Sequence, residues 1–311
     1  MTDLTDLAAE ICTAWGPLAQ APKLIVNREN AVFEVQLASG ARGALRLHRV
    51  GYQTVDSILS ELRWTERLAK AGFACPVPLR TSDGALTVQR DNAPMASLIG
   101  WIDAEPIADM NDEEGPEPSL YQSVGAMIGT LHNRTDQIDL AGITRPFWSR
   151  ETLLGETPIW GCFWENPALT SEDKALLQDA RAKADAALSE LAEPDIGLIH
   201  ADLLQENILH RDGDLWLIDF DDAGFGYRLY DLGTALVQHV YDPRYAAFCD
   251  ALRRGYEDAR GVQVRSEDLQ LFTLLRGFAS CGWIISRAAA NDPIHQVYAD
   301  RAVMLAREFV G

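Results

Sequence analysis

Most of the side chains that could do chemistry stand in one stretch, residues 196–222. This stretch carries a histidine, an asparagine and acidic groups: His200, Asp202, Asn207, Asp219 and Asp221. Asp212-Gly213 separates two short apolar runs within it, and an Asp-Gly pair in that position predicts a β-hairpin. The hairpin would return Asp219 to the neighbourhood of Asp202 and Asn207.

Two carboxylates and an amide in such an arrangement suit the transfer of a phosphoryl group to a hydroxyl. One acid can accept the hydroxyl proton, while the asparagine and the other acid hold Mg²⁺ on the phosphates. The spacing alone does not say which acid takes which part. A set of solvated turn acids is the competing interpretation.

The composition limits the kind of protein. The chain has 311 residues, 47% of them hydrophobic, and a formal net charge of −19, which argues against nucleic acid or anionic membranes as partners. An acidic beginning, residues 1–6, is unlike a signal peptide, and we expect no apolar stretch of 18 residues. Five scattered cysteines predict reduced thiols and a cytoplasmic location.

The elements around the stretch differ between the two parts of the chain. Before residue 103 we expect an amphipathic helix, a meander of three strands, a second helix and two more strands, at 3–16, 24–26, 31–37, 43–48, 55–71, 85–89 and 95–102. An acidic segment, 103–118, follows as a connector or exposed loop. Residues 139–170 are irregular and aromatic. The remaining elements are mainly helices, expected at 121–132, 171–191, 229–240, 245–260, 266–290 and 293–310, with Ser171 as one N-cap.

The motifs of residues 196–232, taken in order, resemble those of a known protein superfamily. His200-x-Asp202-x-x-x-x-Asn207, then Ile218-Asp219-Phe220-Asp221, then Tyr230-Asp231-Leu232, resembles the aminoglycoside phosphotransferase and choline kinase superfamily, nearest to its homoserine kinase type II and stress-response kinase members. The resemblance implies an α+β, protein-kinase-like fold of two lobes. Residues 1–102 would form a nucleotide-binding N-lobe with a small antiparallel sheet, and 103–311 a mostly helical C-lobe with the catalytic loop and acceptor site.

The resemblance also assigns roles within the stretch. Asp202 matches the catalytic base, and Asn207 and Asp219 match ligands of Mg²⁺. Asp221 would reach a second ion or anchor the loop. His200 and Asp231 are expected to be structural, with Asp231 bracing the catalytic loop through backbone N–H groups.

In the N-lobe, Arg46 stands where the superfamily usually has a lysine that pairs with phosphates, and Glu61 stands where a helix glutamate would hold it. The turn 27–30 takes the place of a glycine-rich loop but has no glycine. Residues 98–103 match the hinge, so backbone groups of Gly100, Trp101 and Ile102 would bind the purine of ATP or GTP.

The acceptor site is less defined. Candidates are two acids, three aromatic residues and two arginines: Asp103, Glu105, Trp160, Trp164, Tyr227, Arg276 and Arg287. The function implied is Mg²⁺-dependent transfer of the terminal phosphoryl group of ATP (or GTP) to a hydroxyl of a small molecule. Two alternatives remain open: a Ser/Thr protein kinase of the stress-response type, and a nucleotide-binding pseudokinase scaffold, which Arg46 and the glycine-free turn would suit.

Overall fold

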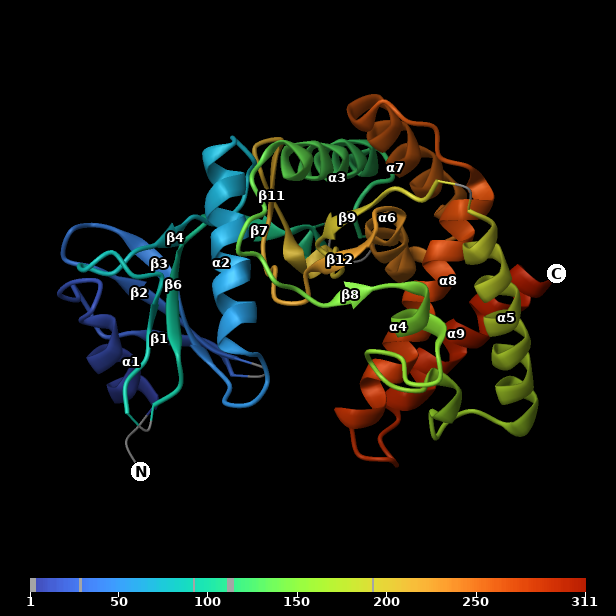
Figure 1. Cartoon of the computed structure of the whole chain (residues 1–311), viewed down its shortest axis with the longest axis horizontal. Helices are drawn as coiled ribbons and strands as arrows, with labels where there is room; N and C mark the ends of the chain where they lie inside the picture. The colour runs from blue at the N-terminus through green and yellow to red at the C-terminus, as the bar shows by residue number, and fades with distance from the viewer. Residues whose placement is uncertain (1–3, 28–29, 92, 111–114, 192) are drawn as a thin grey trace. The chain divides into compact units, whose positions relative to one another are not determined.

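A computed structural model describes residues 4–27, 30–91, 93–110, 115–191 and 193–311. The chain forms two compact units (Figure 1). Unit 1 comprises residues 1–105, 138–145 and 216–221; unit 2 comprises 106–137, 146–215 and 222–311. The chain therefore crosses between the units several times. The lobe boundary expected at 102/103 stays a prediction.

Unit 1 is built on an antiparallel sheet with the strand order β1-β2-β3-β6-β4, in which β5 also pairs with β6. Its strands are β1 (Lys23–Asn27), β2 (Asn30–Gln36), β3 (Arg42–His48), β4 (Pro78–Leu79), β5 (Thr87–Val88) and β6 (Ala96–Gly100). The register of β2 with β3 runs from Asn30 opposite His48 to Gln36 opposite Arg42 without a break. The three-strand meander is therefore confirmed.

Alternation along β3 gives the sheet two different faces. Leu45 and Leu47 point into an apolar cluster that includes α1 (Leu4–Cys12). Arg46, between them, points to the opposite face, where its partner Glu61 lies on α2 (Val55–Lys70). One face of the sheet is therefore apolar core, and the other presents buried charge.

Unit 2 holds two short sheets and most of the helices. The sheet orders are β11-β10-β7 and β8-β12-β9. The strands are β7 (Glu105–Pro106), β8 (Phe147–Trp148), β9 (Ile196–Ile199), β10 (Ile208–Arg211), β11 (Asp214–Leu217) and β12 (Gly224–Tyr227). Asp212 and Gly213, between β10 and β11, both have positive φ, 53° and 92°. Two such residues are what a tight hairpin turn needs, so the predicted hairpin is confirmed.

The helices of unit 2 enclose its main core. They are α3 (Leu120–Gln137), α4 (Arg150–Leu154), α5 (Ser171–Glu190), α6 (Leu229–Leu236), α7 (Tyr245–Arg260), α8 (Ser266–Trp283) and α9 (Ile294–Val310). Single 3₁₀ turns cover Ile107–Asp109, Phe163–Glu165, Gln205–Asn207, Val237–His239 and Ile284–Ser286. In Figure 1, α8 runs beside α9 and α6, and its side chains are buried along almost its whole length. The α+β, kinase-like architecture expected from the sequence is confirmed.

Helices α3 and α7 approach each other unusually closely. A Cβ added to Gly255 would lie 1.8 Å from the backbone oxygen of Gln122, and one added to Gly125 would lie 2.0 Å from the backbone oxygen of Leu252. Glycine is therefore required on both helices, because any side chain there would force them apart.

Several expected boundaries are corrected. The N-cap of α5 is Thr170, whose hydroxyl accepts from the N–H of Asp173, and not Ser171. A 3₁₀ turn, Ile284–Ser286, follows α8 directly, so the α-helix ends at Trp283 and not near 290. Strand β12 is not predicted by the sequence, because Gly224 and Gly226 interrupt its apolar pattern. These glycines let the strand lie against Trp148. The strand expected at 85–89 contracts to β5.

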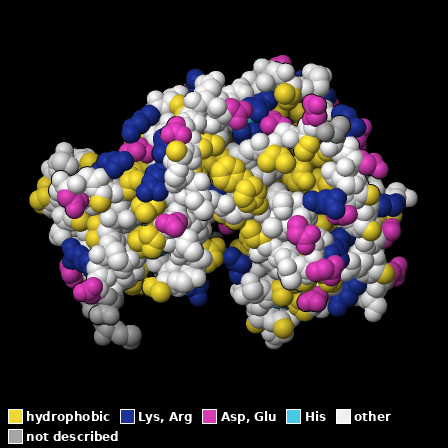
Figure 2. Space-filling view, in the orientation of Figure 1, with side chains coloured by type: hydrophobic (Ala, Val, Ile, Leu, Met, Phe, Trp, Pro, Cys, Tyr) yellow, Lys and Arg dark blue, Asp and Glu magenta, His cyan; other side chains and the backbone are white. Residues whose placement is uncertain are grey.

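One apolar segment also needs correction. Ser266–Ser286, which contains α8, is long and apolar enough by length and composition to cross a membrane, contrary to the expectation of no such stretch. Of that segment, 72% is buried inside the protein, which explains its apolar character as that of a core helix. On the face in Figure 2, acidic and basic side chains are intermixed. The cytoplasmic location stays a prediction.

Candidate active site

The loop between β9 and β10, residues 200–207, carries the predicted base. Ala201 has φ of 65°, a left-handed conformation that a residue with a Cβ adopts at some cost. Asp231 of α6 compensates: its carboxylate accepts hydrogen bonds from the N–H groups of His200 at 3.0 Å and Ala201 at 2.7 Å. The expectation that Asp231 braces this loop is therefore confirmed.

A second buried residue holds Asp231 in turn. His132 of α3 lies with Nε2 at 3.1 Å from Asp231 Oδ2 and Nδ1 at 3.0 Å from the hydroxyl of Tyr256. Burial lowers the pKa of His132, although hydrogen bonding and attraction from Asp231 oppose this. Sequence reasoning missed His132, because one histidine within an apolar helix face gives no sign of a partner 99 residues away.

The two oxygens of the Asp202 carboxylate accept hydrogen bonds from two different side chains. Arg276 of α8 donates from Nη2 to Asp202 Oδ1 at 2.8 Å, and from Nη1 to the backbone oxygen of Ala201 at 2.9 Å. Asn207 donates from Nδ2 to Asp202 Oδ2 at 2.9 Å and to the backbone oxygen of Asp202 at 2.8 Å. The Asp202 side chain remains 20% exposed. The arrangement fixes the direction of a carboxylate that still reaches solvent.

Asn207 presents its amide in a defined orientation. Its two side-chain hydrogen bonds are both donated by Nδ2, and Oδ1 accepts no hydrogen bond from the residues that the structure describes. An amide oxygen that accepts no hydrogen bond from these residues can coordinate a metal ion, and Mg²⁺ prefers oxygen ligands. The predicted role of Asn207 as a metal ligand is compatible with its hydrogen bonding.

Unit 1 contains a separate group of charges centred on Arg46. Its Nη1 lies 2.5 Å from Glu61 Oε1, and its Nη2 lies 3.3 Å from Asp221 Oδ1 and 3.8 Å from Asp219 Oδ1. Burial alone would favour the neutral guanidinium, but attraction from Glu61, Asp221 and Asp219 outweighs it and raises the pKa of Arg46. The predicted Arg46–Glu61 pair is present, and it also gathers both acids of the Asp219–Asp221 run.

This charge group is incompletely hydrogen-bonded. Three of its buried atoms, Arg46 Nη2, Glu61 Oε2 and Asp221 Oδ1, have no hydrogen-bond partner among the described residues. Buried polar atoms in this state cost free energy until a partner arrives. Arg46 Nη2 could donate to a phosphate oxygen, whereas the two carboxylate oxygens would need a donor or a cation.

The two acids of unit 1 differ in their surroundings. The Asp219 side chain is 53% exposed, and its residue has a positive φ of 61°. Asp221 is buried; Asn30 donates to its Oδ2 at 3.4 Å, and burial raises the pKa of its carboxyl, against the influence of Arg46. Asp219 is the better presented of the two for a metal ion. The ligand roles of Asp219 and Asp221 stay predictions.

The hinge residues follow β6. The N–H of Gly100 donates to the oxygen of Val77 at 2.8 Å, and that of Trp101 donates to the oxygen of Arg42 at 3.0 Å. The backbone N–H of Ile102 makes no hydrogen bond to any described residue. Of the three predicted hinge donors, Ile102 is therefore the one with its N–H available to a base.

Two of the acceptor candidates, both arginines, lie over tryptophan rings, whereas others contact different parts of the chain. Arg276 lies with its guanidinium 4.8 Å from the ring of Trp160, and Arg287 lies 4.3 Å above the ring of Trp283. The others lie elsewhere: Trp164 is stacked under Arg181, Tyr227 packs against Phe272, and Asp103 pairs with Arg42. Two sequence predictions fall outside the described residues: positions 28–29 of the glycine-free turn and 111–114 of the acidic segment.

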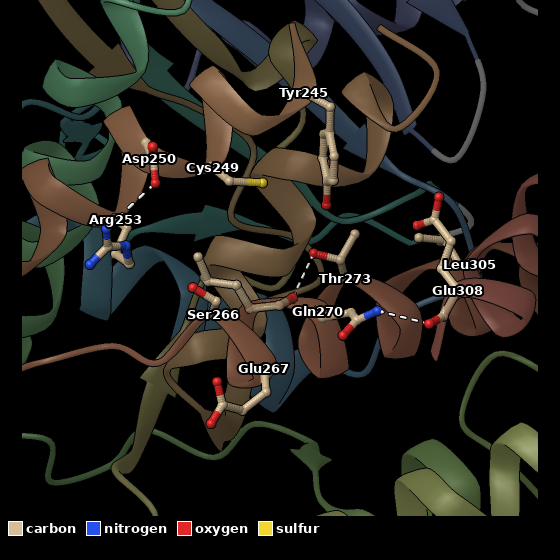
Figure 3. A pocket seen from close by; sticks show the side chains of 11 residues that line it. Tyr245, Cys249, Asp250, Arg253, Ser266, Glu267, Gln270, Thr273, Leu305 and Glu308 are labelled. Carbon is tan, nitrogen blue, oxygen red and sulfur yellow. Dashed lines mark hydrogen bonds and ion pairs between the residues drawn. The ribbon is translucent and has the colours of Figure 1, made fainter. Parts of the chain in front are cut away.

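A hollow of about 440 Å³ opens between α7, α8 and α9 (Figure 3). Tyr245, Cys249 and Thr273 line it, together with charged residues such as Glu267 and Glu308. None of the predicted site residues lines it. The hollow is therefore distinct from the catalytic loop.

Comparison with known proteins gives the class of the chain. Residues 23–267 match the phosphotransferase enzyme family, and the chain belongs to that family. The suspected superfamily is thereby confirmed. The prediction of a phosphotransferase enzyme of the kinase class is confirmed with it.

Individual relatives are distant in sequence. The chain is 22% identical over 242 residues to the amicoumacin kinase of Bacillus subtilis (strain 168), covering 76% of this chain and 68% of the relative. It is 27% identical over 231 residues to the homoserine kinase of Rhizobium meliloti (strain 1021), covering 71% and 64%. The matched region thus spans about two thirds of each relative.

Solved structures match over nearly the full length. A microcompartment-associated aminopropanol kinase superposes with a TM-score of 0.84 at 27% identity, covering 99% of this chain and 98% of the other. An amicoumacin kinase in complex with AMP-PNP, Ca²⁺ and Ami gives 0.77 at 17% identity, covering 99% and 93%. At the lower identity the likeness shows the shared fold alone.

Proposed function

We propose that this protein transfers the terminal phosphoryl group of ATP, or of GTP, to a hydroxyl group of a small molecule in a Mg²⁺-dependent reaction. One observation carries the proposal: a partly exposed carboxylate, Asp202, is aimed by Arg276 and Asn207 within a strained and braced loop. A general base needs such fixed geometry. Family membership supports the same chemistry.

In the proposed reaction the acceptor oxygen attacks the γ-phosphorus, and the bond from that phosphorus to the β,γ-bridging oxygen breaks. The acceptor proton goes to the carboxylate of Asp202, and the nucleoside diphosphate leaves with the bonding electron pair. Arg46, held by Glu61, would bind phosphate oxygens through Nη2, which faces Asp221 and Asp219 but makes no hydrogen bond to a described residue. A loose transfer of this kind depends mainly on positioning and on charge neutralisation.

Two side chains would hold the metal. Asn207 offers an amide oxygen without a competing hydrogen bond, and Asp219 offers a carboxylate that is half exposed. When bound, Mg²⁺ would neutralise developing charge on the phosphates. Asp221 would serve mainly as a partner of Arg46, because it is buried beside that guanidinium.

The nucleotide base would bind at the end of β6. Ile102 would donate its free N–H to a purine nitrogen, while Gly100 and Trp101 would shape the strand end. This contact suits both adenine and guanine, so it does not choose between ATP and GTP.

The relatives give starting points for the acceptor. Their names include homoserine kinase, amicoumacin kinase and aminopropanol kinase. We therefore propose a small hydroxyl compound, with the amino alcohols and hydroxy amino acids as the first to be assayed. A coupled ADP-release screen across these classes, amino sugars and protein substrates would identify it; labelled phosphate on serine or threonine would instead favour a protein kinase.

Replacing the base provides the test. Asp202→Ala should reduce turnover by roughly 10²–10⁴-fold, because it removes the proton acceptor. Nucleotide binding, measured by calorimetry, should be largely retained. Arg307→Gln, an exposed change on α9, serves as the matched control. Near-wild-type turnover of Asp202→Ala on the identified acceptor would refute the assignment.

A further inference from the structure

A continuous run of aromatic rings and guanidinium groups lies in unit 2, and it starts at the arginine that grips Asp202. We name it the aromatic–arginine wall; its members are Arg276, Trp160, Trp283, Tyr298 and Arg301. Along the run the successive separations are 4.8, 6.5, 6.2 and 5.8 Å. Three segments distant in sequence contribute to it: the stretch after α4, helix α8 and helix α9.

Arg301, at the end of this wall, lacks a carboxylate partner. It makes no hydrogen bond or ion pair to any residue that the structure describes, and its Nε is fully buried without a partner. The terminal nitrogens are not among the fully buried atoms. Burial and the nearby charge of Arg276 lower the pKa of Arg301, while Tyr298, Tyr241 and Glu206 act in the opposite direction.

The missing ion pair of Arg301 does not reflect a shortage of carboxylates. The chain has 46 acidic against 27 basic residues, so carboxylates are plentiful. Arg307, two turns further along α9, has Asp173 at 3.7 Å. A partly buried guanidinium that makes no direct ion pair with a described residue costs free energy that an incoming anion would recover. The fork of donors on arginine fits a carboxylate in particular.

The neighbouring rings indicate what else the ligand contains. Trp160, Trp283 and Tyr298 are each only partly buried, so they offer apolar surface to a short carbon skeleton. Arg276 and Arg301 together disfavour an acceptor whose only charge is positive. Arg276 also joins its end of the wall to Asp202 at 2.8 Å, and the charges of Arg276 and of Glu206, the residue before Asn207, both act on Arg301 at the other end.

We propose that the aromatic–arginine wall is the acceptor subsite and that Arg301 binds a carboxylate of the acceptor, which is therefore a small hydroxy acid. This inference rests on the proposed function. In the reaction, the hydroxyl oxygen of the acid forms the new bond to the γ-phosphorus, the bond to the β,γ-bridging oxygen breaks, and the proton passes to Asp202. The carboxylate stays on Arg301 throughout.

Matched pairs of acceptors test the inference. L-homoserine and 3-aminopropan-1-ol differ only in the carboxylate, and so do L-threonine and 1-aminopropan-2-ol. In a coupled ADP-release assay, the wild-type protein should favour the carboxylated member of a pair. Arg301→Gln should lower kcat/KM for that member by roughly ten- to a hundredfold, which is the effect of one charge-assisted hydrogen bond. The member without a carboxylate, which carries only an ammonium charge, should be turned over as before, and Arg301→Lys should recover part of the loss.

Direct binding separates this inference from the proposed function. Calorimetric titration with L-homoserine and with 3-aminopropan-1-ol should show binding of the former that Arg301→Gln weakens and Arg307→Gln does not. If the carboxylate binds in this way but no acceptor yields ADP, the function fails and the subsite stands. The subsite is wrong if Arg301→Gln lowers kcat/KM equally for both members of a pair, if it raises KM for ATP instead, or if the wild type prefers the members without a carboxylate.

Discussion

Arg276 offers the sharpest test of how the catalytic loop works. Its guanidinium is buried and forms two bonds to the loop: one to Asp202 Oδ1 at 2.8 Å and one to the oxygen of Ala201 at 2.9 Å. Methionine has a similar length and no charge, so Arg276→Met removes both bonds with limited loss of packing. Asn207 still holds the other oxygen of Asp202. The proposed base, Asp202, should therefore remain in the loop but lose its fixed direction.

The size of the effect follows from the bond that is lost. A hydrogen bond to a charged group contributes about 1.5–3 kcal/mol. If that contribution serves to aim the base in the transition state, its loss converts to a decrease in kcat of roughly 10- to 150-fold. KM for ATP should stay within about twofold, since positioning of the base does not contribute to nucleotide binding.

A double-mutant cycle tests whether Arg276 affects kcat only through Asp202. Steady-state ADP release would be measured, with the acceptor found by the screen, for Arg276→Met, Asp202→Ala and the combination. If Arg276 acts only through Asp202, it should have no further effect once the carboxylate is gone. Arg276→Lys should restore part of kcat, because lysine can reach one of the two oxygens but not both. Equal losses from Arg276→Met with and without Asp202 would refute the reasoning.

Three further predictions concern stability. Asp231→Asn presents an amide to two backbone N–H groups, so urea denaturation should show a free energy of unfolding lowered by about 1–3 kcal/mol; an unchanged value would mean the loop is held elsewhere. Gly255→Ala should cost about 1–3 kcal/mol or more by the same measurement, because the new Cβ would overlap the oxygen of Gln122 in the closest α3–α7 contact. Burial lowers the pKa of His48 to about 3 and of His239 to about 4, so the folded state binds fewer protons than the unfolded state below about pH 6.5. Stability present above that pH should be lost as the pH falls towards 4, and a melting temperature that stays flat over this range would contradict the prediction.

The parts of the site that the sequence predicted are those joined by short spacing. The hairpin at Asp212 follows from local turn chemistry, and the loop with Asp202 and Asn207 follows from a fixed spacing of residue types. Arg46 and Glu61 are separated by only 15 positions, on a strand and the helix that follows it. Periodicity predicted both elements, and so their pairing could be expected.

The contacts between site residues that are far apart in the sequence can be seen only in the tertiary structure. Arg276, a candidate acceptor contact in the sequence, is 74 residues from Asp202, and only the structure shows that it also holds the Asp202 carboxylate. His132 and Arg301 lie on helices whose patterns explain burial and nothing more. Whether a buried polar side chain is satisfied depends on which other elements pack against it, and spacing within one element carries no information about that. The sequence by itself thus determined the enzyme family and the residue types of the candidate catalytic loop, because both depend on local spacing, whereas only the folded structure decided which distant residues hold Asp202.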